Sequence, residues 1–543
     1  MHLLQLQSGG IDDGSEAVDL GQDPADILIL SAADTELSLL AQAASGTLAS
    51  ENEHAGSVRL ANLLHLAHPM SVDQWIDKTA QHSRLIIARL LGGRNYWPYG
   101  VEELATLAKQ RGLMLALLPG DDKPDADLQA ASTVPPETFQ RLHHYLSHGG
   151  RTNAHRLLQL AQHLVAPEKV DAPPEAAPLL RAGLYWPGLD TPSADDLKKS
   201  WLPDAPCAGI IFYRALMQSG ATQAIGALIQ GLRQEGLNPL PLFVSSLKDP
   251  ESVAVLEHLT QTFPPNLILN TTGFTVAGFH QQGAVSFDGT GVQDPLSRLK
   301  CPVVQIVLSS GTREDWEGGM RGLSARDIAM NVALPEVDGR IIGPTISFKD
   351  DRQWDERTQC WIVKPTAVEE RATAAARLAR NWCALARKTP AERRVALILA
   401  NYPNKDSRLA NGVGLDTPAA AVTVIKALSE RGYSVANPPQ SSGALMQSLL
   451  SMPTNDLAAR AERSGGVTLS LPDYKRAYAD LPESTRRGIE ERWGQPEADP
   501  FFEGAHGSFR LGIIEMGNVI VGVQPARGYN IDPKETYHSP DLP

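Results

Sequence analysis

The sequence lacks the features of a membrane or secreted protein. No run of about 18 apolar residues is present, so we expect no membrane-spanning helix. The first 20 residues contain four acidic side chains and no Lys or Arg, which argues against a signal peptide. Cysteine is scarce, and the four cysteines stand far apart without metal-ligand spacing. We expect these to be reduced, mostly buried cysteines of a cytoplasmic protein: Cys207, Cys301, Cys360 and Cys383.

The short motifs of several enzyme classes are also missing. The sequence contains no phosphate-binding loop of the form GxxxxGK(S/T), and no HExxH, CxxC or GxSxG motif. If the protein takes part in a process that uses ATP, we therefore expect another chain to bind the nucleotide. The formal net charge of −13 argues against non-specific binding to nucleic acid.

The pattern of apolar residues predicts an α/β protein: several α/β domains with mainly parallel sheets and an inserted helical segment. Residues 1–130 alternate short apolar runs with helical patterns, which is typical of a parallel sheet. Residues 136–165 have a helical period that Gly149 and Gly150 should break in two. The expected strands are Ile27–Leu30, Leu60–Leu66, Leu85–Leu90 and Leu113–Leu118, and the expected helices between them are Asp34–Ala44, Val72–Thr79 and Val101–Gln110.

We predict three domains along the 543 residues. The first covers 1–165, and a segment rich in Pro and Ala predicts a linker at 166–183. A second α/β domain covers 184–390, and a third begins at 391 and runs to 543, where we expect it to be truncated. The expected strands of the second domain are Ala208–Tyr213, Pro239–Val244, Leu267–Asn270 and Val303–Leu308, and those of the third are Arg394–Ala400 and a pair within 509–523.

The last expected strand, 518–523, leads into a loop dense in polar side chains. Pro525, Gly528 and Pro533 restrict the shape of this loop. A guanidinium suits a ligand carboxylate, and imidazole and carboxylate groups suit a borderline divalent cation. The alternative is a polar loop that satisfies its own backbone. The candidate side chains are Gln524, Arg527, Tyr529, Asn530, Asp532, Tyr537 and His538.

A second polar segment follows the expected strand 394–400. It includes Asn401 and Tyr402, and then a glycine-containing loop with Asn411 and Asp416. Thr417 should cap the following helix, whose N-terminus would favour an anion. The alternative is a mobile turn with a good helix cap.

Three further groups of residues are weaker candidates. The aromatic residues of Gly92–Gly100 can stack on a planar ligand or can fix the next helix to the sheet, and we favour the second. Phe212–Arg214 and Asn270–Gly273 end strands and can line a cleft. His143, His144 and His148 are expected to lie on a solvated helix face.

Several long segments resemble the CobN/magnesium chelatase large-subunit family. They include GGRNYWPYG (92–100), MNVALPEVDGR (330–340), ANYPN (400–404), NGVGLDTPAA (411–420) and VGVQPARGYNIDP (521–533). The wording of the last segment is more similar to the cobalt enzymes than to the magnesium enzymes. The family protein is more than twice as long, so the resemblance implies the N-terminal part, ending before a motif of the form HGxxEWxPGK.

The resemblance implies the substrate-binding subunit of an ATP-dependent cobaltochelatase. That enzyme inserts its substrate metal, Co²⁺, into hydrogenobyrinic acid a,c-diamide during cobalamin biosynthesis. ATP and Mg²⁺ are then used by partner subunits, an AAA+ ATPase and its companion, with no nucleic acid or membrane involved. The alternatives are a magnesium chelatase subunit acting on protoporphyrin, or a non-catalytic tetrapyrrole-binding module or inactive fragment.

The family's best catalytic candidate, the Glu of the HGxxEWxPGK motif, is not in this chain, so the expected roles of the candidate residues rest on the chemistry of their side chains. Asp532 and His538 are the expected catalytic groups, and His538 is the expected metal ligand, because a carboxylate or imidazole near the ring can serve as base and transient ligand. The expected substrate-binding residues are Asn401, Tyr402, Asn411, Asp416, Gln524, Arg527, Tyr529 and Asn530.

Overall fold

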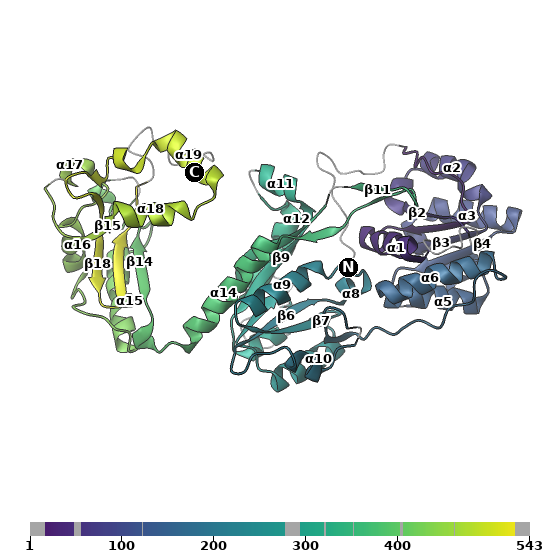
Figure 1. Ribbon diagram of the computed structural model, residues 1–543, viewed down its shortest axis with the longest axis horizontal. Coiled ribbons are helices and arrows are strands. Elements are labelled where there is room, and N and C mark those ends of the chain that lie inside the picture. The colour runs from purple at the N-terminus through teal and green to yellow at the C-terminus, as the bar shows by residue number, and fades with distance from the viewer. Residues whose placement is uncertain are drawn as a thin grey trace. The chain divides into compact units, whose positions relative to one another are not determined.

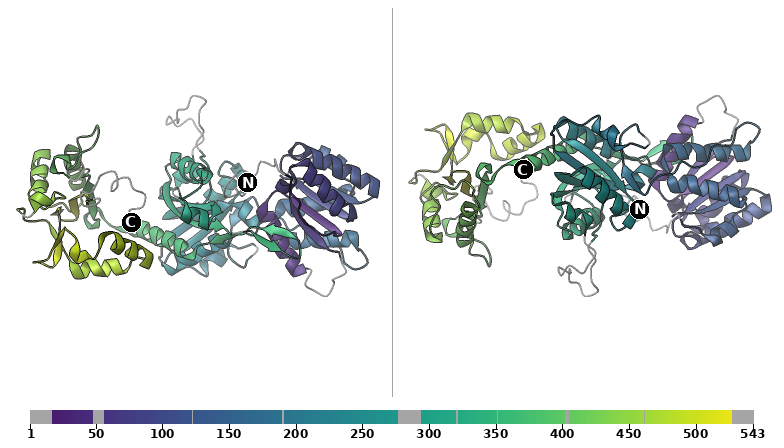
Figure 2. Two further views of the ribbon diagram at one scale, coloured as in Figure 1. Left: turned by 90° about the horizontal axis from the view of Figure 1, so that it is seen from above. Right: turned by 90° about the horizontal axis from the view of Figure 1, so that it is seen from below.

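The computed structural model describes residues 17–47, 56–121, 123–189, 191–276, 294–319, 322–350, 352–401, 405–460 and 462–526 (Figure 1). The chain divides into two compact units, Met1–Cys383 and Ala384–Pro543, here called unit 1 and unit 2. Unit 1 contains two mainly parallel sheets with helices on both faces, so the expected fold class is confirmed (Figures 1 and 2). We call residues 17–165 the first lobe of unit 1 and residues 182–383 the second lobe. The finer division at 165, 183 and 390 stays a prediction.

The first lobe is a four-stranded parallel sheet in the order β2-β1-β3-β4. Its strands are continuous apolar runs, as expected for a parallel sheet covered by helices on both faces. The strands are β1 (Ile27–Ser31), β2 (Val58–Asn62), β3 (Leu85–Leu90) and β4 (Met114–Pro119). One face carries α1 (Asp34–Thr47), α5 (Pro136–His148) and α6 (Gly150–Val165), and the other carries α2 (Pro69–Lys78), α3 (Pro98–Arg111) and α4 (Ala126–Ala131). The expected break at Gly149 and Gly150 is confirmed.

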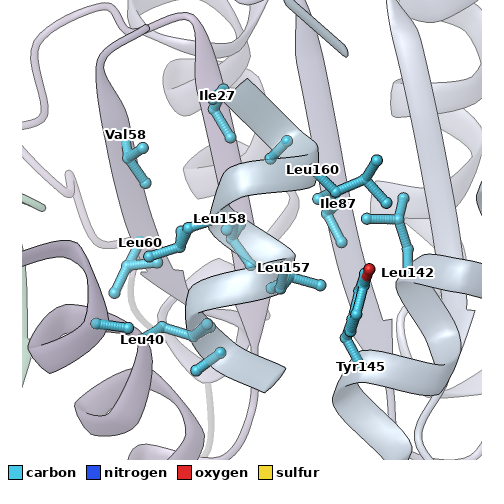
Figure 3. Close-up of a cluster of buried hydrophobic side chains, with 14 of the residues drawn as sticks. Ile27, Leu40, Val58, Leu60, Ile87, Leu142, Tyr145, Leu157, Leu158 and Leu160 are labelled. Carbon is cyan, nitrogen blue, oxygen red and sulfur yellow. The ribbon is translucent and has the colours of Figure 1, made fainter. Parts of the chain in front are cut away.

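Side chains of alternate strand residues enter the two cores of the first lobe. Ile27 and Ile87 point to the face covered by α5 and α6, whereas Leu28 and Ile86 belong to the opposite core. Figure 3 shows Leu157 and Leu158 of α6 lying against the sheet, with Leu142 and Tyr145 of α5 beside them. This packing positions the last turn of α5 relative to the carboxyl ends of the strands.

Of the aromatic residues after β3, Trp97 and Tyr99 hold the next helix in place, as we favoured. Trp97 is buried, and its Nε1–H donates to the carbonyl oxygen of Leu66 at 2.7 Å. A Cβ atom at Gly100 would lie 2.0 Å from the Trp97 ring, so glycine is required where α3 passes the indole. The Tyr99 hydroxyl donates to Asp73 at 2.7 Å. These contacts fix α3 and α2 to the sheet and leave no stacking surface on Trp97.

The second lobe is built on a seven-stranded sheet in the order β13-β10-β9-β8-β6-β7-β5. The five central strands are parallel and the two edge strands are antiparallel to their neighbours. The strands are β5 (Ala182–Leu184), β6 (Cys207–Tyr213), β7 (Asn238–Val244), β8 (Leu267–Asn270), β9 (Val303–Thr312), β10 (Ile341–Lys349) and β13 (Pro365–Ala367). One face of the sheet packs against α9 (Gln223–Gln234) and α14 (Glu369–Arg387), and the other packs against α7 (Ala194–Lys198) and α10 (Pro250–Thr262). The remaining helices are short: α8 (Arg214–Gln218), α11 (Arg313–Gly318), α12 (Ala325–Ile328) and α13 (Leu334–Val337).

A hairpin of the second lobe completes the core of the first. It consists of β11 (Gln353–Asp355) and β12 (Cys360–Ile362), and Cys360 and Ile362 are buried among side chains of α1 and β2. Leu60 donates its N–H to the carbonyl oxygen of Thr358 at 3.0 Å. Lys349, at the end of β10, also pairs with Asp34 at 3.2 Å. Residues far apart in sequence therefore join the two lobes.

The segment 166–181 between the lobes is held against α5 and α6. Asn153 Nδ2 donates to the carbonyl oxygen of Ala177 at 2.8 Å, and Asn153 Oδ1 accepts from the N–H of Ala177 at 2.8 Å. Arg156 donates to the carbonyl oxygen of Glu175 at 2.6 Å. The segment therefore lies along the helices as an extended strap, and the first two residues of β5 fall inside the predicted linker.

Unit 2 contains a three-stranded sheet and a smaller antiparallel sheet. In the first, β14 (Val395–Leu399) pairs in parallel with β19 (Val519–Val523), which pairs with β18 (Ile513–Met516). The helices α15 (Thr417–Glu430) and α16 (Ser442–Leu450) bury Ile425 and Leu445 against one face. The second sheet joins β15 (Val467–Ser470), β16 (Phe502–Glu503) and β17 (Ser508–Leu511), and the other helices are α17 (Leu457–Arg460), α18 (Leu471–Ala479) and α19 (Glu483–Trp493). The strand at 467–470 is not among the strands expected from the sequence.

Among the described residues, no helix is long and apolar enough to span a membrane. The cysteines are mostly buried, as expected: none of the four forms a disulfide, and Cys207, Cys360 and Cys383 are buried. Burial raises the pKa of the Cys207 and Cys360 thiols to about 12, so they stay protonated at neutral pH.

Candidate functional site

The sheet of unit 2 brings two of the expected site segments together. Leu399 and Val523 are partners in the parallel ladder, and the N–H of Gln524 donates to the carbonyl oxygen of Leu399 at 2.8 Å. Because the carboxyl ends of parallel strands share one edge, Asn401 and Gln524 both follow this edge. We call it the Asn401 edge.

The glycine-containing loop also reaches this edge. The N–H of Ala410 donates to the carbonyl oxygen of Ala400 at 2.7 Å, so Ala410 lies beside the residue that precedes Asn401. Asn411 follows Ala410 and therefore begins its loop close to this edge. Asp416 caps α15, because its Oδ1 accepts from the N–H of Ala419 at 3.0 Å. The expected cap, Thr417, is wrong by one residue: it is the first residue of α15. Asp416 and Asn411 are exposed.

The amide of Asn401 is the least satisfied polar group at this edge. The residue is 2% exposed, and neither its Oδ1 nor its Nδ2 has a hydrogen-bond partner in the part of the chain that the structure describes. A buried amide without partners costs free energy, about 1–3 kcal/mol, unless a ligand supplies them. The remaining expected site residues lie outside the described residues: Tyr402, Arg527, Tyr529, Asn530, Asp532, Tyr537 and His538.

A cavity lies in unit 1, between the lobes. Its volume is about 730 Å³. It is lined from both sheets at the carboxyl ends of their parallel strands, where α/β proteins bind ligands. The lining includes Arg89 of β3, Gly120 after β4, Tyr213 and Arg214 at the end of β6, Ser245 after β7 and Thr272 after β8. We call this the lobe cavity.

Only some of the residues that line this cavity were candidate site residues in the sequence. Tyr213, Arg214, Thr272 and Gly273 line it, as expected for residues that end strands. Phe212 and Asn270 are fully buried and act in the sheet instead. Arg89 and the loop 245–248 were missed, although both also stand at strand ends.

A buried ion pair forms part of the cavity wall. Arg89 pairs with Glu36, and their side chains are 7% and 10% exposed. The hydroxyl of Ser31 donates to the second oxygen of Glu36 at 2.5 Å, and Arg89 Nη2 donates to the carbonyl oxygen of Gly120 at 2.9 Å. The pair therefore ties together the carboxyl ends of β1, β3 and β4.

The expectation of a solvated histidine face on α5 is wrong for His143. This residue is 9% exposed, and its Nε2 lies 2.8 Å from the carbonyl oxygen of Asp121. The Nδ1 of His148 accepts from the N–H of Leu179 at 3.2 Å. The helical period could not show that the strap and the loop after β4 cover this face. Burial lowers the pKa of both imidazoles, and the nearby guanidinium of Arg214 lowers that of His148 further.

The lowered pKa of His143 predicts a loss of stability in acid. The unfolded chain binds a proton near pH 6.5, whereas burial in the fold resists protonation. The free energy of unfolding should therefore fall as pH drops below about 6.5. Denaturant unfolding of the chain and of His143→Gln at pH 7.5 and 5.5 tests this. The variant should lose less stability over that range, and an equal loss in both proteins would contradict the assignment.

No group of three or more His, Cys, Asp or Glu side chains that could hold a metal ion occurs among the described residues. The metal role expected of His538 lies outside them.

Comparison with known proteins gives consistent results. The family described as CobN/Magnesium Chelatase matches residues 143–543. The chain is 46% identical to aerobic cobaltochelatase subunit CobN of Sinorhizobium sp and 39% identical to that of Pseudomonas aeruginosa, each over 100% of this chain and 42% of the relative. A solved structure, the catalytic subunit of cobaltochelatase from Mycobacterium tuberculosis, is similar with a TM-score of 0.69 and 26% identity, over 96% of this chain and 40% of that one. The chain thus spans about two-fifths of the length of these relatives.

Proposed function

Because the chain belongs to the CobN/magnesium chelatase family, we propose that it forms part of the large, substrate-binding subunit of an ATP-dependent cobaltochelatase. This enzyme inserts Co²⁺ into hydrogenobyrinic acid a,c-diamide during cobalamin biosynthesis. The observation that carries the proposal is the 46% identity to a cobaltochelatase subunit along the whole chain. An AAA+ ATPase subunit and its companion bind ATP and Mg²⁺, and the complex works in the cytoplasm.

Metal insertion sets physical demands on this subunit. It must hold a ring that carries carboxylate and carboxamide side chains, accept protons from the ring nitrogens and remove water from the metal ion. Amide groups at the Asn401 edge can bind carboxamides, since an amide both donates and accepts hydrogen bonds. Proton acceptance and transient metal binding are the roles we propose for Asp532 and His538. Arg527, Tyr529, Asn530, Tyr402, Asn411 and Asp416 are proposed to contact the substrate.

Substrate preference tests this proposal. Hydrogenobyrinic acid a,c-diamide and protoporphyrin are titrated separately into the chain and into the chain extended at its C-terminus by the rest of the family subunit. Both ligands absorb visible light, so binding is followed by absorbance. We expect the corrinoid to bind more tightly to both proteins. A preference of the extended protein for protoporphyrin would instead indicate a magnesium chelatase.

The role of Asn401 can be separated from a structural one. In Asn401→Leu, the fold loses two buried atoms that lack partners, so the melting temperature should stay the same or rise. Corrinoid affinity should fall about tenfold, the cost of one good hydrogen bond to the ligand.

The matched control is Asn455→Leu, next to the same edge. Asn455 Nδ2 donates to the carbonyl oxygen of Gln524 at 2.8 Å, so this variant should lose about 1 kcal/mol of stability. If Asn401→Leu destabilises unit 2 as Asn455→Leu does, while corrinoid affinity is unchanged, then Asn401 has no role in binding.

A further inference from the structure

The buried amide of Asn401 stands on a backbone that is held in place from both sides. Asn401 forms an antiparallel bridge with Leu409, and the N–H of Gln524 donates to the carbonyl oxygen of Leu399, two residues before Asn401. Leu399 and Leu409 are buried. Among the described residues, Asn401 is the buried side chain whose donor and acceptor atoms both lack a partner. An unfilled pair of hydrogen-bonding groups therefore has a fixed position at the end of β14.

The charged groups near this edge are already paired with one another. Arg463 forms an ion pair with Asp406, and its Nη1 donates to Thr454 Oγ1 at 2.7 Å. Thr454 Oγ1 in turn donates to Asp406 Oδ1 at 2.6 Å. The next residue, Asn455, donates to the carbonyl oxygen of Gln524 at 2.8 Å, which places this network beside the edge. The buried group left without partners is thus a neutral amide and not a charge.

A carboxamide is the ligand group that matches this amide. The Asn401 side chain has an acceptor, Oδ1, and a donor, Nδ2, and a ligand carboxamide has the same two functions. Two amides can therefore satisfy each other with a pair of hydrogen bonds. A carboxylate only accepts, so it leaves Oδ1 unsatisfied and also brings a charge into a buried position. A site that needs a donor rejects a ligand without one by about tenfold or more.

The neighbouring loop gives a ligand a route to Asn401, which is 2% exposed. Residues 411–416 begin one residue after Ala410, and Gly414 in this loop has a φ of +75°. Val413 is fully exposed and Leu415 is 60% exposed, so little packing holds the loop in place. The loop can move aside for a ligand arm, and its two apolar side chains can then contact the ring.

We propose that Asn401 is a specificity-determining residue: it pairs with one carboxamide of the corrinoid and selects the amidated ring over the same ring with free carboxylates. This inference rests on the proposed function, which supplies a ring that carries two carboxamides. The incoming carboxamide displaces no hydrogen bond of Asn401, so both new bonds contribute to binding. A carboxylate arm gains only the bond from Nδ2.

The affinities of wild type and Asn401→Leu for two rings test the proposal, with the 543-residue chain as the protein. The probes are hydrogenobyrinic acid a,c-diamide and the same ring with carboxylates in place of both carboxamides, titrated separately by absorbance. Wild type should prefer the diamide. Asn401→Leu should lower this preference about tenfold, because it loses affinity for the diamide and little for the acid. The net charge of −13 disfavours the more anionic ring in both proteins, so the readout is the change in preference.

Two further variants separate recognition from a structural role. Asn401→Gln keeps an amide and should retain part of the preference for the diamide. Asn455→Leu removes an amide that already has a partner beside the same edge, so it should leave the preference unchanged even if both rings bind more weakly. Melting temperatures show whether each variant is folded.

The same preference in wild type and Asn401→Leu would overturn the proposal, as would an equal loss of preference in Asn455→Leu or binding of neither ring by wild type. Cobalt insertion by the complete complex is scored separately. Insertion together with an unchanged preference in Asn401→Leu refutes only the role of Asn401. A lowered preference in Asn401→Leu without cobalt insertion refutes only the proposed function.

Discussion

Replacing Arg89 with methionine should destabilise unit 1 by about 3–5 kcal/mol, because it leaves the Glu36 carboxylate buried without a cation. Both side chains are at most 10% exposed, and the guanidinium also donates to the carbonyl oxygens of Gly120 and Leu146. Every tryptophan except Trp493 lies in unit 1, so the change in tryptophan fluorescence with denaturant reports mainly its unfolding.

Two controls identify the buried pair as the cause. The double variant Glu36→Gln, Arg89→Met removes both charges and should regain part of the loss. Arg94→Met breaks the exposed pair with Glu102, whose side chains are 48% and 61% exposed, and should cost less than about 1 kcal/mol. If Arg89→Met and Arg94→Met have similar small effects, the Glu36–Arg89 pair does not hold the strand ends.

Arg340→Met should have an effect of similar size in the second lobe, about 3–5 kcal/mol. The Arg340 side chain is 1% exposed, and it pairs with Asp338 at 3.1 Å and with Asp294 at 3.7 Å. Asp338 in turn accepts from Thr275 Oγ1 at 2.5 Å and from the N–H of Val276 at 2.8 Å. Because residues 272–276 line the lobe cavity, the variant should also disturb the wall of that cavity.

The control for this variant is Arg298→Met. Arg298 pairs with Glu257 at 2.8 Å, but their side chains are 56% and 36% exposed, so the loss should stay below about 1 kcal/mol. Denaturant unfolding gives the stability of both variants. Wild-type stability in Arg340→Met would show that the two aspartates find other partners.

The central strands were predictable because they are apolar runs buried on both faces. The strand β10 was not, since Gly343 and Pro344 interrupt it and its register with β9 shifts at this point. The hairpin β11–β12 has only three residues in each strand, and its role comes from contact with the other lobe. The local pattern of apolar residues therefore predicted most of the central strands. The contacts between the lobes became visible only in the structure.

The same reasoning explains what could be predicted of the site. Asn401 and Gln524 each follow an apolar run, and the parallel pairing of those runs brings them to one edge. Glu36 and Arg89 are 53 residues apart, on a helix and a strand, so no local pattern reports their pairing. The lobe cavity needs strand ends from two separate sheets, and its lining is visible only when they are brought together.

Cobalt insertion by the assembled enzyme tests the central claim most directly. The chain, extended at its C-terminus by the rest of the family subunit, is combined with the two partner subunits, hydrogenobyrinic acid a,c-diamide, Co²⁺ and ATP. The account predicts ATP-dependent loss of the metal-free corrinoid spectrum and formation of the cobalt corrinoid, with no insertion of Mg²⁺ into protoporphyrin. Insertion of Mg²⁺ into protoporphyrin, with the corrinoid left unchanged, would contradict it.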